Sequence, residues 1–280
     1  MKSLEIKWKL VILTAVALTA SNAVAEPIAG VAGEAKIFKN ASGETMPYRL
    51  FLPSELKAEQ SYPLVLCFHG AKGRGTENEA KGSLAYSVLT SPEMQRDHPA
   101  IIIAPQCPDG KRWVNHDWKD GAYDSKKVAV SDEMTMALTL VDRLIEELPV
   151  DPTRIYVTGR SMGGFATWDA IARRPDFFAA AVPIAGGGDP QCAEDWANLP
   201  IWAIASAGDG TCPVSGTREV VEALKKIGAE IKYTEDPEKG HGDICQAWED
   251  VAGLQDWLFE QRNEPANQSS QSTGNATADF

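Results

Sequence analysis

The chain has 280 residues, of which 44% are hydrophobic and 24% are charged, as in an ordinary globular protein with one large domain. Its formal net charge is −12 at pH 7, and an acidic surface disfavours binding to nucleic acid and to anionic membranes. Its cysteines and histidines do not have the spacing of a zinc site, so we expect no metal and no cofactor.

The first 25 residues have the pattern of a cleavable signal peptide. Lys2, Lys7 and Lys9 give a basic start, and the apolar stretch 10–20 is too short to span a bilayer comfortably. Residues 23–25, Ala-Val-Ala, match an A-x-A cleavage site. The sequence therefore predicts a secreted or periplasmic protein, cleaved after Ala25 and not inserted in the membrane afterwards. An uncleaved N-terminal anchor is the alternative.

Strand and helix patterns alternate along the rest of the chain. Short apolar or alternating runs predict strands at 35–39, 46–52, 62–68, 100–104, 154–158, 179–184, 201–206 and 230–234. Helical periodicity or position predicts helices at 132–148, 162–173, 217–227 and 246–261. This alternation predicts an α/β fold with a mostly parallel, eight-stranded sheet flanked by helices. We expect one domain over residues 26–262, and a disordered polar tail over 263–280.

A loop from 106 to 131 is unusually long and carries several aromatic residues. Loops of this length in compact domains are usually functional or disordered. Trp113, His116 and Trp118 are candidates for a wall that stacks against a sugar or aryl group of a substrate. The alternative is that the tryptophans cover the edge of the core.

The stretch 154–173 contains the pattern G-x-S-x-G between a predicted strand and a predicted helix. Gly159, Ser161 and Gly163 occupy the fixed positions of this pattern. A serine at a sharp strand-to-helix turn is the arrangement of a nucleophile elbow, and glycines remove side chains that would clash there. Ser161 is therefore the candidate nucleophile, against the alternative of an idle serine in a glycine-rich turn.

A serine nucleophile needs a base, and the base needs an acid that orients it. In α/β-hydrolases the order along the chain is serine, acid, histidine, and of the four histidines His241 alone follows Ser161. Asp209 follows the strand 201–206 and is the preferred acid, with Asp189 as runner-up.

The oxyanion hole of such an enzyme is made of two backbone N–H groups. Met162 directly follows the nucleophile, and Ala71 lies in the loop after the strand 62–68, so these two residues are the candidates. His69 is then expected to hold that loop by hydrogen bonds rather than to transfer protons.

Several blocks of sequence together resemble secreted esterases of the α/β-hydrolase superfamily. The resemblance lies in 63–71 (PLVLCFHGA), 104–108 (APQCP), 150–164, 200–203 (PIWA) and the spacing Asp209-x3-Pro-Val, and it covers about residues 35–262. The similar group is the bacterial phospholipase/carboxylesterase-like set, akin to polyhydroxyalkanoate depolymerases and feruloyl or acetylxylan esterases. The resemblance implies Ser161 as nucleophile, Asp209 as acid and His241 as base. One departure is that Ala205-Ser206 stands where relatives often have His-Gly before the acid.

The expected function is hydrolysis of carboxylic esters through an acyl-enzyme on Ser161. Because 186–201 is too short for a large cap domain, the site should be open and suit short acyl chains, aryl or sugar esters, or esters on a polymer. The substrate is thus a small-molecule or polymer-linked ester, and the oligomeric state is left open. A prolyl-oligopeptidase-like peptidase or amidase is the first alternative, and a non-catalytic binding protein on the same fold is the second.

The five cysteines are an odd number, so at least one is unpaired within the chain. Cys212 follows Asp209 by three residues, and Cys245 follows His241 by four. Since an acid and its base are neighbours, these two cysteines are expected to form a disulfide after export. Free thiols at both positions, or a Cys107–Cys192 bridge, are the alternatives.

Overall fold

A computed structural model describes residues 32–57, 59–78 and 83–263. The predicted signal peptide and most of the predicted disordered tail lie outside these residues. The strands are β1 Glu34–Lys39, β2 Thr45–Phe51, β3 Tyr62–Phe68, β4 Ile101–Pro105, β5 Val150–Arg160, β6 Ala180–Ile184, β7 Trp202–Ser206 and β8 Lys232–Asp236. The α-helices are α1 Leu84–Leu89, α2 Pro92–Asp97, α3 Asp132–Glu147, α4 Met162–Arg173, α5 Ser215–Lys226, α6 His241–Ile244, α7 Ala247–Asp250 and α8 Leu254–Glu260. Three 3-10 turns are η1 Ala71–Gly73, η2 Trp118–Asp120 and η3 Pro190–Cys192.

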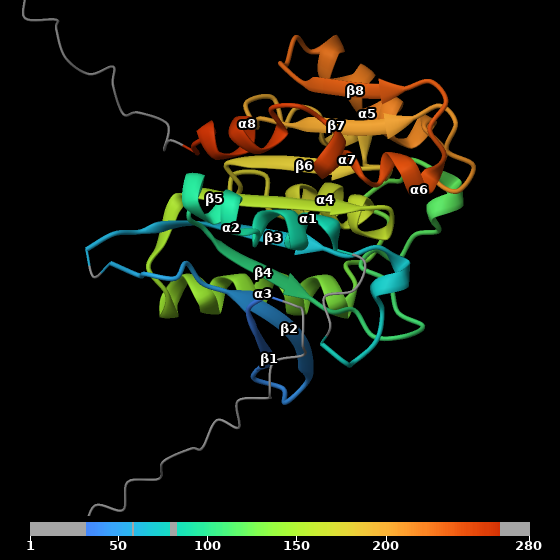
Figure 1. The fold of residues 1–280 in the computed structure, drawn as a ribbon. Helices are drawn as coiled ribbons and strands as arrows, with labels where there is room; N and C mark the ends of the chain where they lie inside the picture. Colours follow the sequence, from blue (N-terminus) through green and yellow to red (C-terminus); the bar gives the residue numbers. More distant parts are fainter. Residues whose placement is uncertain (1–31, 58, 79–82, 264–280) are drawn as a thin grey trace, which may run out of the picture.

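The eight strands form one sheet in the order β1-β2-β4-β3-β5-β6-β7-β8 (Figure 1). β1 pairs antiparallel with β2, and β2 with β4, while every later pair is parallel. The predicted mostly parallel sheet is confirmed. Parallel strands end at the same edge, so the loops after β3, β5, β7 and β8 meet there.

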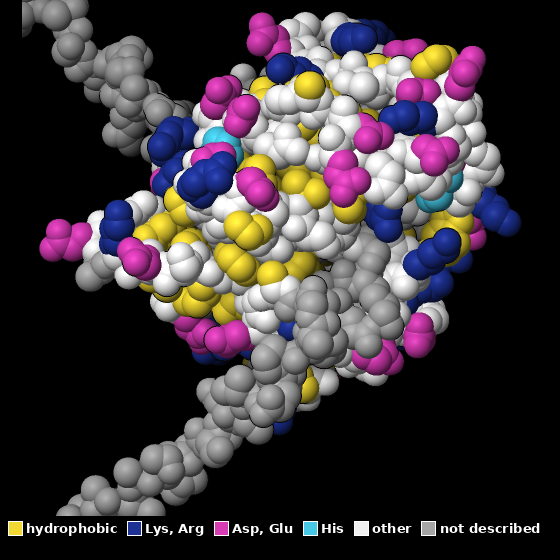
Figure 2. Space-filling view, viewed as in Figure 1, with side chains coloured by type: hydrophobic (Ala, Val, Ile, Leu, Met, Phe, Trp, Pro, Cys, Tyr) yellow, Lys and Arg dark blue, Asp and Glu magenta, His cyan; other side chains and the backbone are white. Residues whose placement is uncertain are grey.

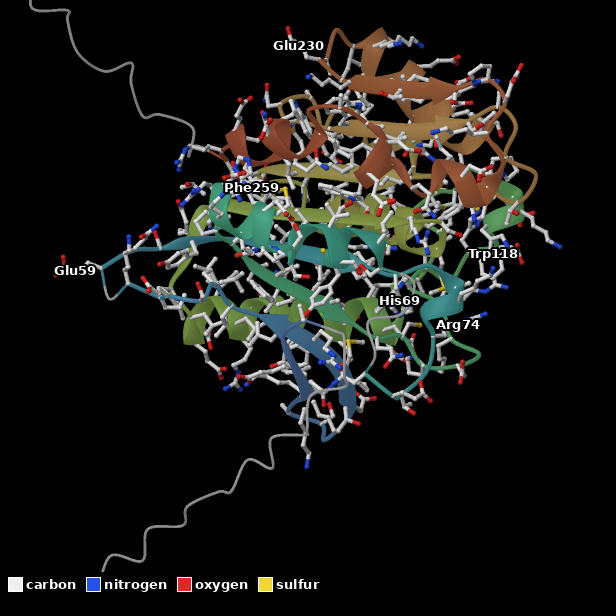
Figure 3. All side chains as sticks on the ribbon, viewed as in Figure 1. Glu59, His69, Arg74, Trp118, Glu230 and Phe259 are labelled. Atoms are coloured by element: carbon white, nitrogen blue, oxygen red, sulfur yellow. The ribbon has the colours of Figure 1, made fainter. Side chains whose placement is uncertain are left out.

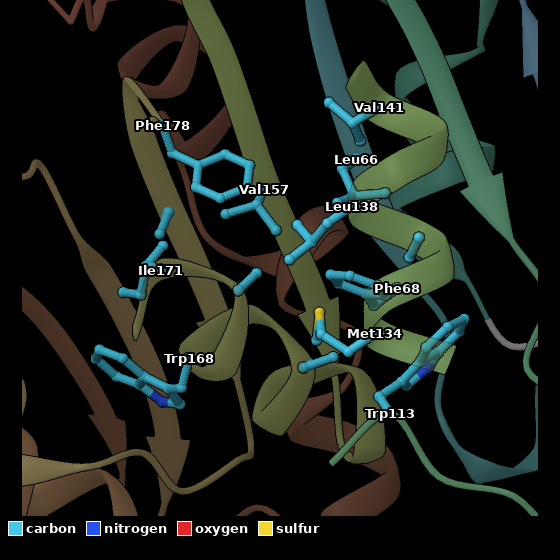
Figure 4. Close-up of a cluster of buried hydrophobic side chains, with 14 of the residues drawn as sticks. Leu66, Phe68, Trp113, Met134, Leu138, Val141, Val157, Trp168, Ile171 and Phe178 are labelled. Carbon is cyan, nitrogen blue, oxygen red and sulfur yellow. The ribbon is translucent and has the colours of Figure 1, made fainter. Parts of the chain in front are cut away.

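Helices cover both faces of the sheet, and each face has its own core. Alternate residues of β3 point to opposite faces: Leu64, Leu66 and Phe68 join one cluster, and Val65 and Cys67 join the other. The first cluster packs against α3, α4 and α5 and is drawn in Figure 4. The second packs against α1, α7 and α8. β3 is buried along its whole length, as its continuous apolar sequence predicts.

Two predicted elements differ in the structure. The helix expected at 246–261 is broken into α7 and α8: Val251 takes an extended conformation after α7, and Gly253, with a φ of 75°, precedes the first residue of α8. The edge strand expected at 230–234 begins only at Lys232. The turn at Gly228, with a φ of 79°, closes α5, and strand pairing starts at Trp202 with Lys232.

The disulfide expected between Cys212 and Cys245 is not formed, and all five cysteines are free thiols. Cys212 belongs to the cluster on the α3–α5 face of the sheet, whereas Cys245 belongs to the cluster on the α1–α8 face. The two loops are neighbours, as expected, but they direct these side chains into different cores.

Acidic and basic side chains are interspersed on the face shown in Figure 2, without one large basic patch. Within residues 32–57, 59–78 and 83–263, the structure contains no helix with both the length and the apolar character needed to cross a bilayer.

Candidate active site

Ser161 lies at the turn between β5 and α4 in a conformation that non-glycine residues rarely adopt. Its φ is 56° and its ψ is −123°. A side chain held at positive φ costs free energy and is found mostly at functional sites, where the surrounding structure imposes it. The turn presents the serine side chain beyond the end of β5, which is the geometry of the predicted nucleophile elbow.

The structure brings Ser161, His241 and Asp209 together in one line of hydrogen bonds. His241 Nε2 lies 2.8 Å from Ser161 Oγ, and His241 Nδ1 lies 2.7 Å from Asp209 Oδ2. Ser161 follows β5, Asp209 follows β7, and His241 follows β8 at the start of α6. These are three of the loops at the carboxyl edge of the parallel strands. With the proton on Nδ1, the ring accepts from the serine hydroxyl and donates to the carboxylate.

Asp209 is held as a carboxylate by its hydrogen bonds. Burial alone would raise its pKa, but the hydrogen bonds from His241 and from the backbone N–H groups of Cys212 and Thr211 outweigh burial and lower it. The two backbone groups donate to Oδ1 at 2.9 and 2.8 Å, which leaves Oδ2 for the histidine. The loop itself therefore orients the carboxylate towards His241.

Asp189, the alternative acid, is placed differently. It is fully buried, and its Oδ2 accepts from the backbone N–H of Ser125 at 2.7 Å while Oδ1 accepts from that of Gln191 at 2.9 Å. Both oxygens thus fasten the loop 106–131 to the start of η3. The hydrogen bonds of Asp189 therefore hold the backbone in place, and no hydrogen bond joins Asp189 to His241 in the described part of the chain.

The loop after β3 approaches the elbow closely. A Cβ added at Gly70 would lie 3.5 Å from Ser161 Cβ, so Ala71 follows directly after a residue in contact with the elbow. Met162 is the first residue of α4, and Ala71 is the first residue of η1. The two predicted oxyanion donors are thus at the starts of two helical turns beside Ser161.

His69 joins this loop to the next one. Its Nδ1 lies 2.8 Å from the Gly70 carbonyl oxygen, and its Nε2 accepts the backbone N–H of Cys107 at 2.9 Å. One nitrogen donates and the other accepts, so the ring is neutral. Burial lowers its pKa to about 4, and this outweighs the opposite effect of the Gly70 carbonyl. These contacts fit the predicted role of holding the loop.

The depressed pKa of His69 predicts a loss of stability in acid. Between its ordinary pKa of 6.5 and about 4, the unfolded chain binds a proton here that the folded chain does not. The stabilising contribution is complete above pH 6.5 and declines by about 3 kcal/mol as the pH falls to 4. Urea unfolding at several pH values should show this decline, and His69→Gln should make it shallower over the same window. Equal pH slopes in the two proteins would contradict the assignment.

Trp113 does not form part of a substrate wall, so that prediction is wrong. Its side chain is fully buried, donates from Nε1 to the His69 carbonyl oxygen at 3.2 Å, and packs against Phe68 with ring centroids 4.9 Å apart. The indole instead fixes the strand end that leads into Gly70. The position of Trp113 agrees with the alternative prediction, in which this tryptophan packs on the core.

His116 and Trp118 lie nearer the elbow. Together with Arg112, Met162 and Phe165 they line a shallow recess beside the first turn of α4. The Arg112 guanidinium stacks over the Trp118 ring at 4.6 Å, an arrangement that sequence reasoning missed. Figure 3 shows Trp118 on the same side of the molecule as His69, away from Glu59 and Phe259. These two residues remain candidates for substrate contact.

The fold and this arrangement define the class of protein: the chain has the α/β-hydrolase fold, with a serine, a histidine and an aspartate arranged as in serine hydrolases. A family model described as the prolyl oligopeptidase family matches residues 100–201, a range that includes Ser161 but ends before Asp209. The crystal structure of a thermostable esterase is 35% identical, with a TM-score of 0.73, and the match covers 81% of this chain and 62% of that one.

Two curated relatives represent two kinds of hydrolase. Poly(3-hydroxyalkanoate) depolymerase C of Paucimonas lemoignei is 31% identical over 137 residues, which cover 49% of this chain and 30% of the relative. Dipeptidyl-peptidase 5 of Porphyromonas gingivalis is 28% identical over 175 residues, which cover 61% of this chain and 24% of the relative. The chain therefore spans less than a third of the length of either relative.

Proposed function

We propose that this serine hydrolase is an exported carboxylesterase in which Ser161 is the nucleophile, His241 the base and Asp209 the acid. The observation that carries the proposal is the pair of hydrogen bonds of 2.8 and 2.7 Å that joins the three side chains. Similarity to esterases supports the ester as substrate. Export rests on the signal-peptide pattern of residues 1–25, which the structure does not describe.

Each step of the proposed reaction uses a group placed as above. Ser161 Oγ attacks the ester carbonyl carbon while His241 Nε2 takes the hydroxyl proton. Asp209 keeps the ring in the tautomer with its proton on Nδ1 and stabilises the imidazolium that forms. The backbone N–H groups of Met162 and Ala71 stabilise the oxyanion. His241 then protonates the leaving alcohol, and water attacks the acyl-enzyme by the same route in reverse.

The connection between β6 and β7 supports an open substrate site. Cap domains would require a long insertion, and this fully described connection contains only the short turn η3. An open site suits a short acyl group, an aryl or sugar ester, or an ester linkage along a polymer. The recess beside His116 and Trp118 is the place where we expect one end of the substrate to lie.

A peptidase or amidase is the second candidate, because the family model matching residues 100–201 carries the description of prolyl oligopeptidases. The two candidates share the nucleophile and differ in the leaving group. Amide hydrolysis demands protonation of a much poorer leaving group, so an enzyme adapted to esters should hydrolyse a matched amide far more slowly.

The deciding experiment compares p-nitrophenyl acetate with p-nitroacetanilide, which has the same acyl and aryl groups. We expect efficient turnover of the ester, little turnover of the amide, and loss of the ester activity in Ser161→Ala. Comparable kcat/KM values for the two substrates would favour the peptidase. Unchanged ester turnover in Ser161→Ala would overturn the assignment of the nucleophile.

The open site predicts a preference for short acyl chains. Acetate and butyrate esters should be hydrolysed with higher kcat/KM than decanoate or longer esters, since the recess is too small to hold a long chain. Initial rates across a p-nitrophenyl ester series measure this directly. Preference for long-chain triglycerides, with a rise in rate above their solubility limit, is the outcome that rejects the open-site prediction.

A further inference from the structure

A second kind of chemistry is possible at the same loops, because a thiol lies beside the acid and the base. A carboxylate oxygen of Asp209, the Cys212 sulfur and a ring nitrogen of His241 all lie within 4.8 Å of one another. Asp209 and Cys212 are neighbours on the loop between β7 and α5, and His241 faces them from α6. The cluster thus joins two loops that are far apart in the sequence.

These three ligand types suit a cation of intermediate softness. Zn²⁺ binds Cys sulfur at about 2.3 Å and His nitrogen or carboxylate oxygen at about 2.0–2.2 Å. Around a tetrahedral ion, such ligands lie about 3.5 Å apart, so the cluster needs to contract by roughly 1 Å at its widest. A thiolate ligand disfavours Mg²⁺ and Ca²⁺, which prefer oxygen.

The side chain of Cys212 is not one of the links between acid and base. Asp209 accepts from the backbone N–H of Cys212, at 2.9 Å, and not from its thiol. The sulfur is nearly fully buried, while the His241 side chain is 22% exposed. His241 is therefore the accessible member of the cluster, and Cys212 is a buried one.

We propose that Asp209, Cys212 and His241 form an inhibitory binding site for a thiophilic divalent cation such as Zn²⁺ or Cd²⁺. The cation replaces the thiol proton, which is released to solvent, and a metal–sulfur bond forms. The carboxylate and the lone pair of a His241 nitrogen complete three ligands, and water or Ser161 takes a fourth position. The thiolate and carboxylate together balance the charge of the ion.

Inhibition follows from either mode of histidine coordination. If Nε2 binds the ion, its lone pair no longer accepts from Ser161. If Nδ1 binds, the ring proton moves to Nε2, which then donates to Ser161 instead of accepting. The site itself depends on the positions of the three ligands, and only the loss of activity depends on the proposed role of His241.

Cd²⁺ is the probe that tests the site, because a cadmium–thiolate bond has an ultraviolet charge-transfer band whatever the activity of the enzyme. Titration of the full-length protein should produce a band equivalent to one thiolate per chain, with parallel loss of esterase activity that EDTA reverses. Cys212→Ser should abolish the band. It should also raise the Cd²⁺ concentration for half-inhibition by at least about tenfold, as loss of even a group that orients a ligand costs about 10- to 100-fold in affinity.

Cys245→Ser is the matched control, since Cys245 is also a buried free thiol on the neighbouring loop. It should keep the band and the inhibition, with each variant compared with its own metal-free activity. Ser161→Ala should keep the band while lacking activity, so a wrong nucleophile assignment is distinguished from a wrong metal site. A band that survives Cys212→Ser, or that requires Cys245, overturns the proposal, as does equal inhibition of wild type and Cys212→Ser.

Discussion

Alanine at Ser161 or His241 should lower kcat for ester hydrolysis by about 10⁴- to 10⁶-fold, with a much smaller change in KM. Both side chains act on the reacting bond, so their loss removes stabilisation of the transition state rather than binding of the substrate. Asp209→Ala should cost somewhat less, about 10⁴-fold, because the remaining histidine is misoriented but present. Single-substrate kinetics with p-nitrophenyl acetate, on variants shown to be folded, measure all three effects.

Asp189, the alternative acid, provides the control for this prediction. Asp189 accepts two backbone hydrogen bonds in a buried setting, so Asp189→Asn should lower the free energy of unfolding and leave kcat within a few-fold of wild type. Asp209→Asn should lower kcat strongly and change the free energy of unfolding less, since Asp209 hydrogen-bonds His241. If Asp189→Asn abolishes turnover while Asp209→Asn is nearly as active as wild type, the acid has been misassigned.

The residues that meet in this site could be predicted from their order along the chain and from the topology of the sheet. A serine after one parallel strand, an aspartate after another and a histidine after a third must converge at the same edge of the sheet. Most strands could be predicted from apolar or alternating runs, and their mostly parallel arrangement from their alternation with helices. Even the missed helix α2 had a sequence signal, since Ser91 caps it and Pro92 occupies its first turn.

Two of the remaining differences depend on the direction in which a side chain points, and one depends on the backbone. Cys212 and Cys245 are close to Asp209 and His241 in sequence, but proximity of two loops does not fix the direction of their side chains. Trp113 is in a long polar loop, yet its hydrogen bond to the His69 carbonyl oxygen draws it into the core. The break between α7 and α8 is a backbone effect at Val251 and Gly253, which an apolar period cannot reveal. Each of these requires coordinates.

Gly163→Ala should disrupt the elbow where β3 and α4 approach each other. A Cβ at Gly163 would lie 2.3 Å from the Phe68 carbonyl oxygen, and one at Gly159 would lie 2.4 Å from the Gly163 carbonyl oxygen. Real Cβ atoms do not approach backbone so closely, so β3 and the first turn of α4 must separate. Crowding of this kind costs about 1–3 kcal/mol or more of stability. A displacement of about 1 Å at the nucleophile costs about 100-fold in rate.

Gly242→Ala provides the comparison, because it lies next to His241 and an added Cβ there would meet no atom within 4 Å. We expect Gly242→Ala to keep its urea midpoint and its kcat, whereas Gly163→Ala should lose at least about 100-fold in kcat and unfold at lower urea. Both variants add the same methyl group, one two residues after Ser161 and the other next to His241, its hydrogen-bond partner. A Gly163→Ala protein that matches Gly242→Ala in stability and turnover would mean that the close approach of β3 to α4 is not what positions Ser161.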